Sequence, residues 1–230
     1  MRVHTRLLPA FVGLFLVATF LGGKAAQAAS EDATHPTPSA LTTDPSGWED
    51  IMPAPDLKGW FHVPIPITSK PLRQQWHVEN GTLVCDGDGG HNMLALDRKL
   101  RNCIFHAEFC LTKIEGKTGY NSGVFIRTAR DHSIWYQAEV GSLRGGYWIA
   151  VASNGAPMIN LSAESAPCRV KEAGEWNTYE LTAKGRNLSL WVNGFPSAPL
   201  SDCSLDEGYI ALEGEGYLVT FRNLKLKVLP

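Results

Sequence analysis

The sequence predicts an all-β protein, folded as a sandwich or jelly roll of two antiparallel sheets. Short segments in which apolar and polar residues alternate recur along the chain, and Gly, Asn, Asp or Pro separates them. No long window shows apolar residues at the 3.6-residue period of a helix. The 230 residues include 22 Gly and 14 Pro, which supply the turns that many short strands require. Together these observations favour two packed antiparallel sheets.

The expected strands are runs rich in β-branched and aromatic residues, each bounded by turn formers. Asn80-Gly81 and Asn193-Gly194 are dipeptides typical of tight hairpin turns. In chain order the expected strands cover residues 76–79, 82–86, 93–96, 104–114, 122–129, 134–140, 147–151, 178–184, 187–192, 209–213 and 218–228.

The N-terminus has the pattern of a secretory signal peptide. Arg2 and Arg6 precede an apolar stretch over residues 7–21, and Ala26-Gln27-Ala28 offers a small-x-small cleavage site. The alternative is a transmembrane anchor, but the stretch is shorter than the ~20 residues that a spanning helix needs. We therefore expect residues 1–28 to be cleaved and the protein to be secreted or periplasmic, with no later membrane span.

The remaining chain divides into a leader and one domain. Residues 29–45 are rich in Ser, Thr, Pro and Ala and have little to bury, which predicts a flexible leader. Residues 46–230 then form a single β-sandwich domain. A net charge of −2 without a basic block argues against a nucleic-acid partner, and the oligomeric state stays open.

The five cysteines do not define a disulfide framework. Because their number is odd, at least one is unpaired within the chain. Cys103 and Cys110 share one expected strand and would be ~20 Å apart, too far to bond. No spacing is typical of a zinc site. We expect mostly small core residues, with one optional bridge among Cys85, Cys103, Cys110, Cys168 and Cys203.

One expected strand carries an unusual outward face. In residues 134–140, Tyr136, Ala138 and Val140 share one face, and Trp135, Gln137 and Glu139 share the other. A solvated face is the simpler interpretation. However, large rings recur on such faces, at Phe125 and Trp191 as well as Trp135. Rings beside polar side chains suit sugars, since the ring covers C–H groups while the polar groups bind hydroxyls.

Six motifs occur in order along the chain: Asp56-Leu57-Lys58-Gly59-Trp60, Trp76-His77-Val78-Glu79-Asn80-Gly81, Asn121-Ser122-Gly123-Val124-Phe125-Ile126-Arg127, Glu175-Trp176-Asn177-Thr178-Tyr179-Glu180, Trp191-Val192-Asn193-Gly194 and Phe221-Arg222-Asn223-Leu224. In this order and spacing they resemble the 3-keto-disaccharide hydrolase domain family over about residues 46–229. The resemblance implies a concanavalin A-like jelly roll of two curved antiparallel sheets, a bacterial envelope or secreted setting, and activity on glycosides oxidised to a ketone at sugar carbon 3.

A 3-keto sugar permits a reaction that differs from ordinary glycoside hydrolysis, which usually needs two carboxylates. The ketone acidifies the hydrogen on carbon 2, so one base can remove it and form an enolate. The enolate then expels the group at carbon 1, and water adds afterwards. This route needs a base near carbon 2 and a cationic or hydrogen-bonding group at the enolate oxygen. The sequence leaves hydrolysis and elimination both open.

The resemblance assigns catalytic roles to Glu139, as the base or acid/base, and to Arg127, as the group that stabilises the enolate or pairs with Glu139. A structural alternative for Arg127 is a salt bridge between adjacent strands. Gln137 is expected to bind hydroxyls, and Trp135 to stack on the sugar. Asn121 either contacts sugar or shapes the turn before its strand.

Glu215 and His132 complete the predicted substrate-binding set. Glu215 has an alternative role in bracing the C-terminal strand by pairing with Arg222, and His132 can be an ordinary exposed loop residue. Relatives more often carry an amide where Glu213 stands, which puts a ligand role for Glu213 in doubt.

No metal ligands are assigned, and no cofactor is expected to be required. Residues 86–92 resemble a calcium loop but lack its twelfth-position glutamate, since Asp97 stands there; they are interpreted as a Gly-rich turn. A divalent cation such as calcium stays open. The leading function is cleavage of 3-keto-glycosides, a small carbohydrate being the partner. The alternatives are a non-catalytic carbohydrate-binding module and an accessory surface protein.

Overall fold

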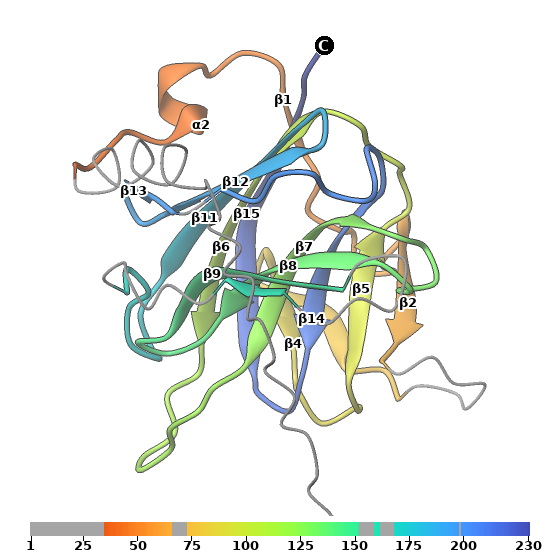
Figure 1. The fold of residues 1–230 in the computed structure, drawn as a ribbon. Helices are drawn as coiled ribbons and strands as arrows, with labels where there is room; N and C mark the ends of the chain where they lie inside the picture. The colour runs from red at the N-terminus through yellow and green to blue at the C-terminus, as the bar shows by residue number, and fades with distance from the viewer. Residues whose placement is uncertain (1–34, 66–72, 152–158, 162–167, 198) are drawn as a thin grey trace, which may run out of the picture.

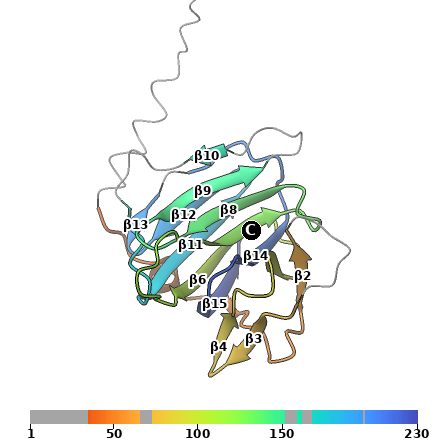
Figure 2. The ribbon, with the colours of Figure 1, turned by 90° about the horizontal axis from the view of Figure 1, so that it is seen from below.

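The computed structural model describes residues 35–65, 73–151, 159–161, 168–197 and 199–230; the expected signal peptide lies outside them. Two antiparallel sheets pack face to face, as Figures 1 and 2 show. This arrangement confirms the predicted all-β sandwich. Among the described residues no helix is long and apolar enough to cross a membrane.

The first sheet, called sheet A, has the order β13-β12-β11-β6-β15-β4-β3, with β1 also paired to β15. Its longest strands, β6 and β15, lie side by side at its centre. Their neighbours β11 and β4 extend the sheet on either side. The bounds are β1 Trp48–Asp50, β3 Trp76–Glu79, β4 Thr82–Cys85, β6 Cys103–Leu111, β11 Asn177–Lys184, β12 Asn187–Val192, β13 Phe195–Pro196 and β15 Val219–Val228.

The second sheet, called sheet B, has the order β10-β9-β8-β7-β14-β5-β2. All of its pairings are antiparallel. The bounds are β2 Trp60–Pro64, β5 Asn92–Leu96, β7 Ser122–Thr128, β8 Trp135–Val140, β9 Gly145–Val151, β10 Ile159–Leu161 and β14 Tyr209–Gly214.

The hydrophobic core lies between the sheets and takes the apolar face of each strand. On β6 the predicted inward set Phe105, Ala107, Phe109 and Leu111 is buried, which confirms the period-two pattern. The strands β1 and β2 were not predicted, because each is short and flanked by Pro or Gly. The residues predicted to face inward on β11, β12 and β8 are also buried: Tyr179, Leu181, Ala183, Leu188, Leu190, Val192, Tyr136, Ala138 and Val140.

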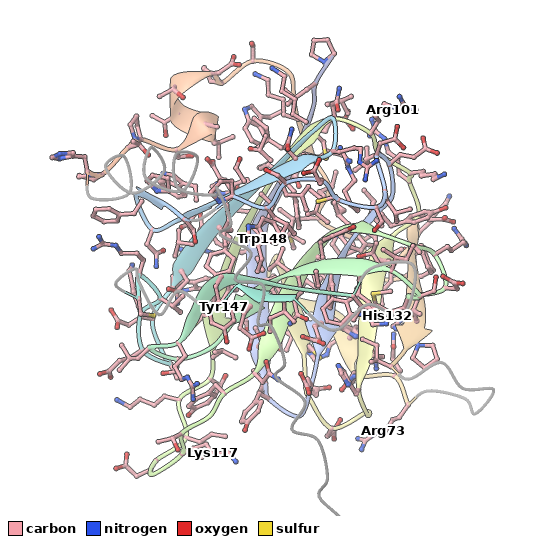
Figure 3. The ribbon with its side chains drawn as sticks, in the orientation of Figure 1. Arg73, Arg101, Lys117, His132, Tyr147 and Trp148 are labelled. Carbon is pink, nitrogen blue, oxygen red and sulfur yellow. The ribbon has the colours of Figure 1, made fainter. Side chains whose placement is uncertain are left out.

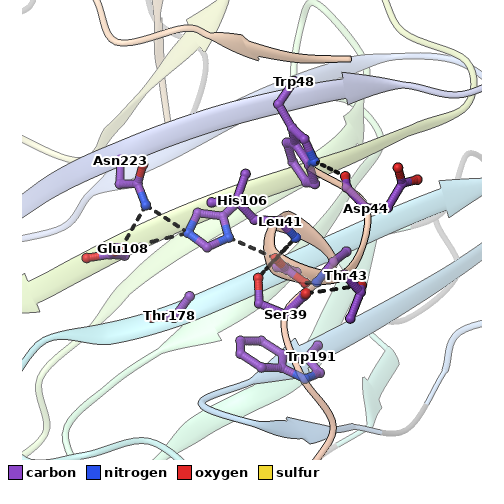
Figure 4. Close-up of polar contacts among 12 residues, drawn as sticks. Ser39, Leu41, Thr43, Asp44, Trp48, His106, Glu108, Thr178, Trp191 and Asn223 are labelled. Atoms are coloured by element: carbon purple, nitrogen blue, oxygen red, sulfur yellow. Dashed lines mark hydrogen bonds and ion pairs between the residues drawn. The ribbon is translucent and has the colours of Figure 1, made fainter. Parts of the chain in front are cut away.

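The described part of the predicted leader is held against the outer face of sheet A. A single-turn helix, α2 (Ala40–Thr43), begins beside Glu180 on β11. The Glu180 carboxylate accepts hydrogen bonds from Ser39 Oγ at 2.5 Å and from the amide of Ala40 at 2.8 Å. His106 Nδ1 lies 2.9 Å from the same carboxylate. Figure 4 shows this segment between His106 and Trp191, so residues 37–44 are not a free leader.

Trp191 was expected among the rings of a sugar cleft, and the structure contradicts this. Its indole nitrogen donates to the carbonyl and hydroxyl oxygens of Thr37, at 3.1 and 3.0 Å. Because β12 belongs to sheet A, this ring lies on a different sheet from Phe125 and Trp135. Trp191 therefore anchors the N-terminal segment.

All five cysteines are free, so the optional bridge is not formed. Cys85, Cys103 and Cys203 are buried, as expected of small core residues. Burial raises the pKa of Cys85 to about 12 and the pKa of Cys103 to about 11, so neither is a thiolate at neutral pH.

Candidate functional site

The side chains of β8 divide as the sequence predicts. Tyr136 and Ala138 enter the core, while Gln137 and Glu139 lie on the outer face of sheet B. Gln137 stands opposite Phe125 of β7, and Glu139 stands opposite Gly123. The outer face of β8 is thus the starting point of a polar site.

A second carboxylate joins this site from β14. Gln137 Nε2 donates to Glu139 Oε2 at 3.2 Å and to Glu213 Oε2 at 2.8 Å. Glu213 is only 3% exposed, and its other oxygen, Oε1, lies 2.7 Å from His91 Nε2. Both oxygens of Glu213 are therefore hydrogen-bonded.

A third carboxylate follows from the register between β5 and β14. Glu213 pairs with Met93 and Gly214 pairs with Asn92, so Glu215 continues the ladder opposite His91. Side chains two residues apart share a face, which brings His91, Glu213 and Glu215 together. His91 Nε2 lies 3.8 Å from Glu215 Oε2. Asn121 Nδ2 donates to the same Glu215 oxygen at 2.6 Å.

The turn before β5 is braced so that His91 faces the site. Buried Gln75 accepts from the amide of Gly89 at 2.8 Å and donates to the carbonyl of Gly90 at 2.7 Å. Asn92 accepts from the indole nitrogen of Trp76 at 2.8 Å. These hydrogen bonds hold the Gly-rich segment, interpreted from sequence as a turn, so that His91 lies next to Glu213.

Two residues of the Asn121-Ser122-Gly123 motif support this arrangement: Gly123 leaves room for the Gln137 amide, and Ser122 links two strands. A Cβ on Gly123 would stand 2.4 Å from Gln137 Nε2, so only glycine lets the amide lie over β7. Ser122 Oγ donates to the carbonyl of Glu213 at 2.9 Å and ties β7 to β14.

The pKa values of Glu139, Glu213 and His91 are all raised, although the causes differ. Burial raises the pKa of Glu139 to about 8, and the charges of Glu213 and Glu215 contribute. Burial raises the pKa of Glu213 as well. Burial alone would lower the pKa of His91, but the hydrogen bond to Glu213 and the negative charges of Glu213 and Glu215 together outweigh burial, so the pKa is raised. Arg144 is the counter-charge that lowers the pKa of Glu139.

Aromatic and aliphatic side chains cover the neighbouring part of the same face. The Trp135 ring stacks on His132 at 5.4 Å between centroids and 12° between planes. It meets Phe125 edge-on at 5.8 Å. Burial lowers the pKa of His132 to about 4, so this imidazole is neutral at pH 7. The buried members of the cluster are Val63, Met93, Ala95, Phe125 and Ala211.

Tyr147 joins the site from β9. A bulge lies between the Ala138 and Val140 pairings, opposite Glu139. Tyr147 precedes Trp148, the partner of Ala138, so its side chain is on the outer face beside this bulge. Burial raises the pKa of Tyr147, and the charge of Glu139 adds to this effect. Figure 3 shows Tyr147 and His132 well apart on the molecule.

A pocket of about 550 Å³ includes Arg144 in its lining and lies between the 113–120 loop and the 142–144 turn.

Arg127 does not join the site, which corrects its predicted pairing with Glu139. Its guanidinium donates to the carbonyls of Leu205, at 2.9 Å, and Arg101, at 2.6 Å. Arg127 has φ 58°, and the register between β7 and β14 shifts beside it, so a β-bulge interrupts the alternation of faces. Arg127 therefore fastens β7 to two loops.

The other predicted residues have the following positions. Asn121 holds Glu215 instead of merely shaping a turn. The alternative pairing of Glu215 with Arg222 is wrong, because Arg222 Nε donates to Glu108 at 2.7 Å. Trp135, Gln137 and Glu139 share one face, and His132 stacks on that face.

The sequence did not select His91, Glu213, Arg144 or Tyr147. The signal that could have identified Glu213 is the alternation Glu213-Gly214-Glu215, which puts two carboxylates on one strand face. His91 had no local signal, because only the pairing of β5 with β14 brings it to the carboxylates.

Solved structures of several carbohydrate-related proteins have the same fold. A Parabacteroides distasonis protein, provisionally assigned as a glycosyl hydrolase, matches with TM-score 0.57 and 15% identity, over 85% of this chain and 100% of that chain. A Bacillus subtilis carbohydrate-binding module matches with TM-score 0.56 and 15% identity, over 73% and 94%. A lichenase from a mouse hindgut metagenome matches with TM-score 0.51 and 12% identity, over 74% and 92%. These likenesses confirm the predicted jelly-roll sandwich.

No curated protein matches the chain in sequence. A family model does match, over residues 47–227, and its description is a 3-keto-α-glucoside-1,2-lyase-like domain. This match spans both sheets and every site residue described above. The chain therefore belongs to the 3-keto-disaccharide hydrolase domain family, as its motifs predicted.

Proposed function

We propose that this protein cleaves 3-keto-glycosides by removing the hydrogen at carbon 2 of the keto sugar, with Glu139 as the base. The observation that carries the proposal is the position of Glu139 on the outer face of β8, with a pKa raised to about 8. A base whose pKa lies near the working pH combines good proton affinity with a sizeable deprotonated fraction.

Each bond change in the proposed reaction is accounted for. Glu139 takes the proton from carbon 2, and the C–H electron pair moves into the enolate formed with the 3-keto group. Collapse of the enolate expels the oxygen at carbon 1 with its electron pair. The proton that Glu139 took from carbon 2 passes to this oxygen, which returns Glu139 to its carboxylate form. Water then adds to the unsaturated sugar. Gln137 positions the base through its 3.2 Å hydrogen bond to Glu139.

The geometry favours this route over double displacement by two carboxylates. Glu139 and Glu213 each bond to Gln137 Nε2, so the two bonded oxygens are at most about 6 Å apart, a limit that includes the ~5–5.5 Å separation of retaining glycosidases. However, Glu213 is buried and both of its oxygens are engaged by His91 and Gln137. It offers no free oxygen for attack on a sugar carbon.

A non-catalytic carbohydrate-binding module is the second candidate. The stacked Trp135 and His132 rings favour it, because a flat ring surface binds sugars without any chemistry. The two candidates differ in turnover, which a binding module lacks at every pH.

The test is incubation of the mature chain with 3-keto-trehalose and with trehalose, from pH 6 to pH 9. We expect products from the keto sugar alone. Glu139→Gln should abolish turnover and keep sugar binding, whereas Glu79→Gln, a substitution of an exposed carboxylate, should change neither. Binding without turnover would favour the module, and cleavage of plain trehalose would contradict the keto-dependent route.

We also infer that the protein acts outside the cytoplasm, after removal of residues 1–28. The charged, apolar and small-residue regions of the N-terminus support this. N-terminal sequencing of the exported protein should give a start at Ala29; recovery of the chain with Met1 intact from the cytoplasm alone would contradict it.

A further inference from the structure

We propose that His91, Glu213 and Glu215 bind a divalent transition-metal ion, such as Mn²⁺, Co²⁺ or Zn²⁺, beside Glu139. The site itself stands on the geometry of these three side chains. Its part in catalysis rests on the proposed function, because the ion would bind an oxygen of the keto sugar.

The three ligand atoms already converge. One ligand atom from each residue lies within 4.8 Å of the other two. His91 Nε2 is 2.7 Å from Glu213 Oε1 and 3.8 Å from Glu215 Oε2. Nitrogen and oxygen ligands stand about 2.0–2.2 Å from such an ion, so two of them are at most ~4.4 Å apart. Small side-chain rotations therefore suffice to enclose an ion.

The ligand types select the class of ion. Calcium and magnesium prefer six or more oxygen ligands, whereas an imidazole nitrogen suits zinc, manganese and cobalt. Three protein ligands leave coordination positions open, which is typical of a site that also takes water or substrate. A sugar offers adjacent oxygens for those positions.

The charge around the site favours a cation. Gln137 Nε2 is hydrogen-bonded to both Glu139 and Glu213, and Glu215 Oε2 lies 3.8 Å from His91 Nε2, so three carboxylates gather beside a single imidazole. Arg144 is a further positive group, and its charge lowers the pKa of Glu139. In the structure a hydrogen bond joins His91 to Glu213. An ion would replace that shared proton, as metal binding to histidine requires.

Surrounding side chains orient the proposed ligands. Gln137 donates to Glu213 at 2.8 Å, and Asn121 donates to Glu215 at 2.6 Å. Gln75 fixes the turn that carries His91. Metal sites depend on such supporting hydrogen bonds, which hold the ligands in place.

An independent observation points to a missing ligand near the same carboxylate. In the part of the chain that the structure describes, Asn121 Oδ1 is buried and has no hydrogen-bond partner. Buried polar atoms are nearly always paired, so an orphaned oxygen indicates an unfilled interaction. An amide oxygen beside Glu215 would accept from a water molecule bound to the ion.

The proposed ion would supply the positive charge that Arg127 does not. Arg127 is engaged by the Arg101 and Leu205 carbonyls, so it cannot serve the enolate. An ion held by His91, Glu213 and Glu215 would polarise the 3-keto oxygen and stabilise the negative charge that develops there.

Isothermal titration of the mature protein with Mn²⁺, Co²⁺ and Zn²⁺ tests the site directly. We expect one ion per chain, with affinity lowered by at least about 100-fold in His91→Ala and Glu215→Gln, because loss even of a supporting hydrogen bond costs 10- to 100-fold. Asn121→Ala should weaken binding about 10-fold. His77→Ala is the matched control, since His77 stands between two exposed carboxylates at 3.7 and 3.6 Å, and it should bind as wild type does.

The outcomes separate this inference from the proposed function. Equal affinity in wild type and His91→Ala, or no binding in wild type, overturns the site. Keto-sugar cleavage that continues unchanged after chelation, without ion binding, overturns the site and leaves the proposed function intact. Ion binding that His91→Ala abolishes, without keto-sugar cleavage, supports the site and contradicts the function. Thermal unfolding of each variant verifies that it is folded.

Discussion

The side-chain amide of Gln137 occupies the space that a Cβ on Gly123 would need. The clash distance would be 2.4 Å, well inside van der Waals contact. Because this amide links Glu139 to Glu213, the link requires glycine at position 123 of the Asn121-Ser122-Gly123 motif.

We predict that Gly123→Ala displaces Gln137 and lowers both turnover and stability. Overpacking of a buried position typically costs ~1–3 kcal/mol in the free energy of unfolding. A double-mutant cycle with Gln137→Ala gives the check, because removal of the amide vacates the space. The glycine substitution should then cost little further stability. An unchanged cost in the Gln137→Ala background would show that the two side chains do not compete.

The pH dependence of turnover should follow the ionisation of Glu139. Its pKa of about 8 keeps it mostly protonated at pH 7, and a base must be deprotonated, so kcat/KM should rise with pH and level off above about pH 8. In protein treated with a chelator, Glu215→Gln removes a negative charge that raises this pKa and should shift the profile to lower pH. Steady-state rates across pH measure both effects, and Glu79→Gln should not move the profile.

Protein stability should fall as Glu139 ionises. Its pKa is raised in the folded state, so between pH ~4.5 and ~8 the folded chain holds a proton that the unfolded chain has lost. Stability from this group is therefore full below the unfolded pKa and is lost as pH rises. Glu139→Gln should stabilise the protein at pH 9 by on the order of 3 kcal/mol and much less at pH 5. Urea unfolding at both values checks this, and equal gains would contradict it.

Arg127 should contribute to stability and not to catalysis. The residue is 1% exposed and its guanidinium donates to two carbonyls, so Arg127→Ala should lower the free energy of unfolding by ~2–4 kcal/mol. Turnover per folded molecule should stay near the wild-type value. The matched control is the neighbouring exposed Arg130, which forms a surface ion pair with Asp97 worth about 1 kcal/mol or less. Loss of kcat in folded Arg127→Ala would restore its catalytic assignment.

The alternation of strand faces could be predicted from sequence because it is a local property. The β6 core residues and the outward trio Trp135, Gln137 and Glu139 follow directly from a period of two. The same rule fails at Arg127, where positive φ and a bulge shift the side chain away from the site.

The rest of the site depends on contacts between distant parts of the chain. His91 reaches Glu213 across 122 sequence positions through the register of β5 with β14. Asn121 reaches Glu215 across 94 positions. No local pattern encodes these pairings, so a His in a Gly-rich turn gave no indication of its partners.

The contact between residues 37–44 and sheet A bears on how this protein should be produced in shortened form. The family match begins at residue 47, but Ser39, Ala40 and Leu41 supply hydrogen-bond donors to the Glu180 carboxylate. A fragment cut at the family boundary would leave Glu180, 4% exposed in the intact fold, with only His106 as a partner. Expression plasmids should therefore encode the chain from before Thr37, even though the recognisable domain starts later.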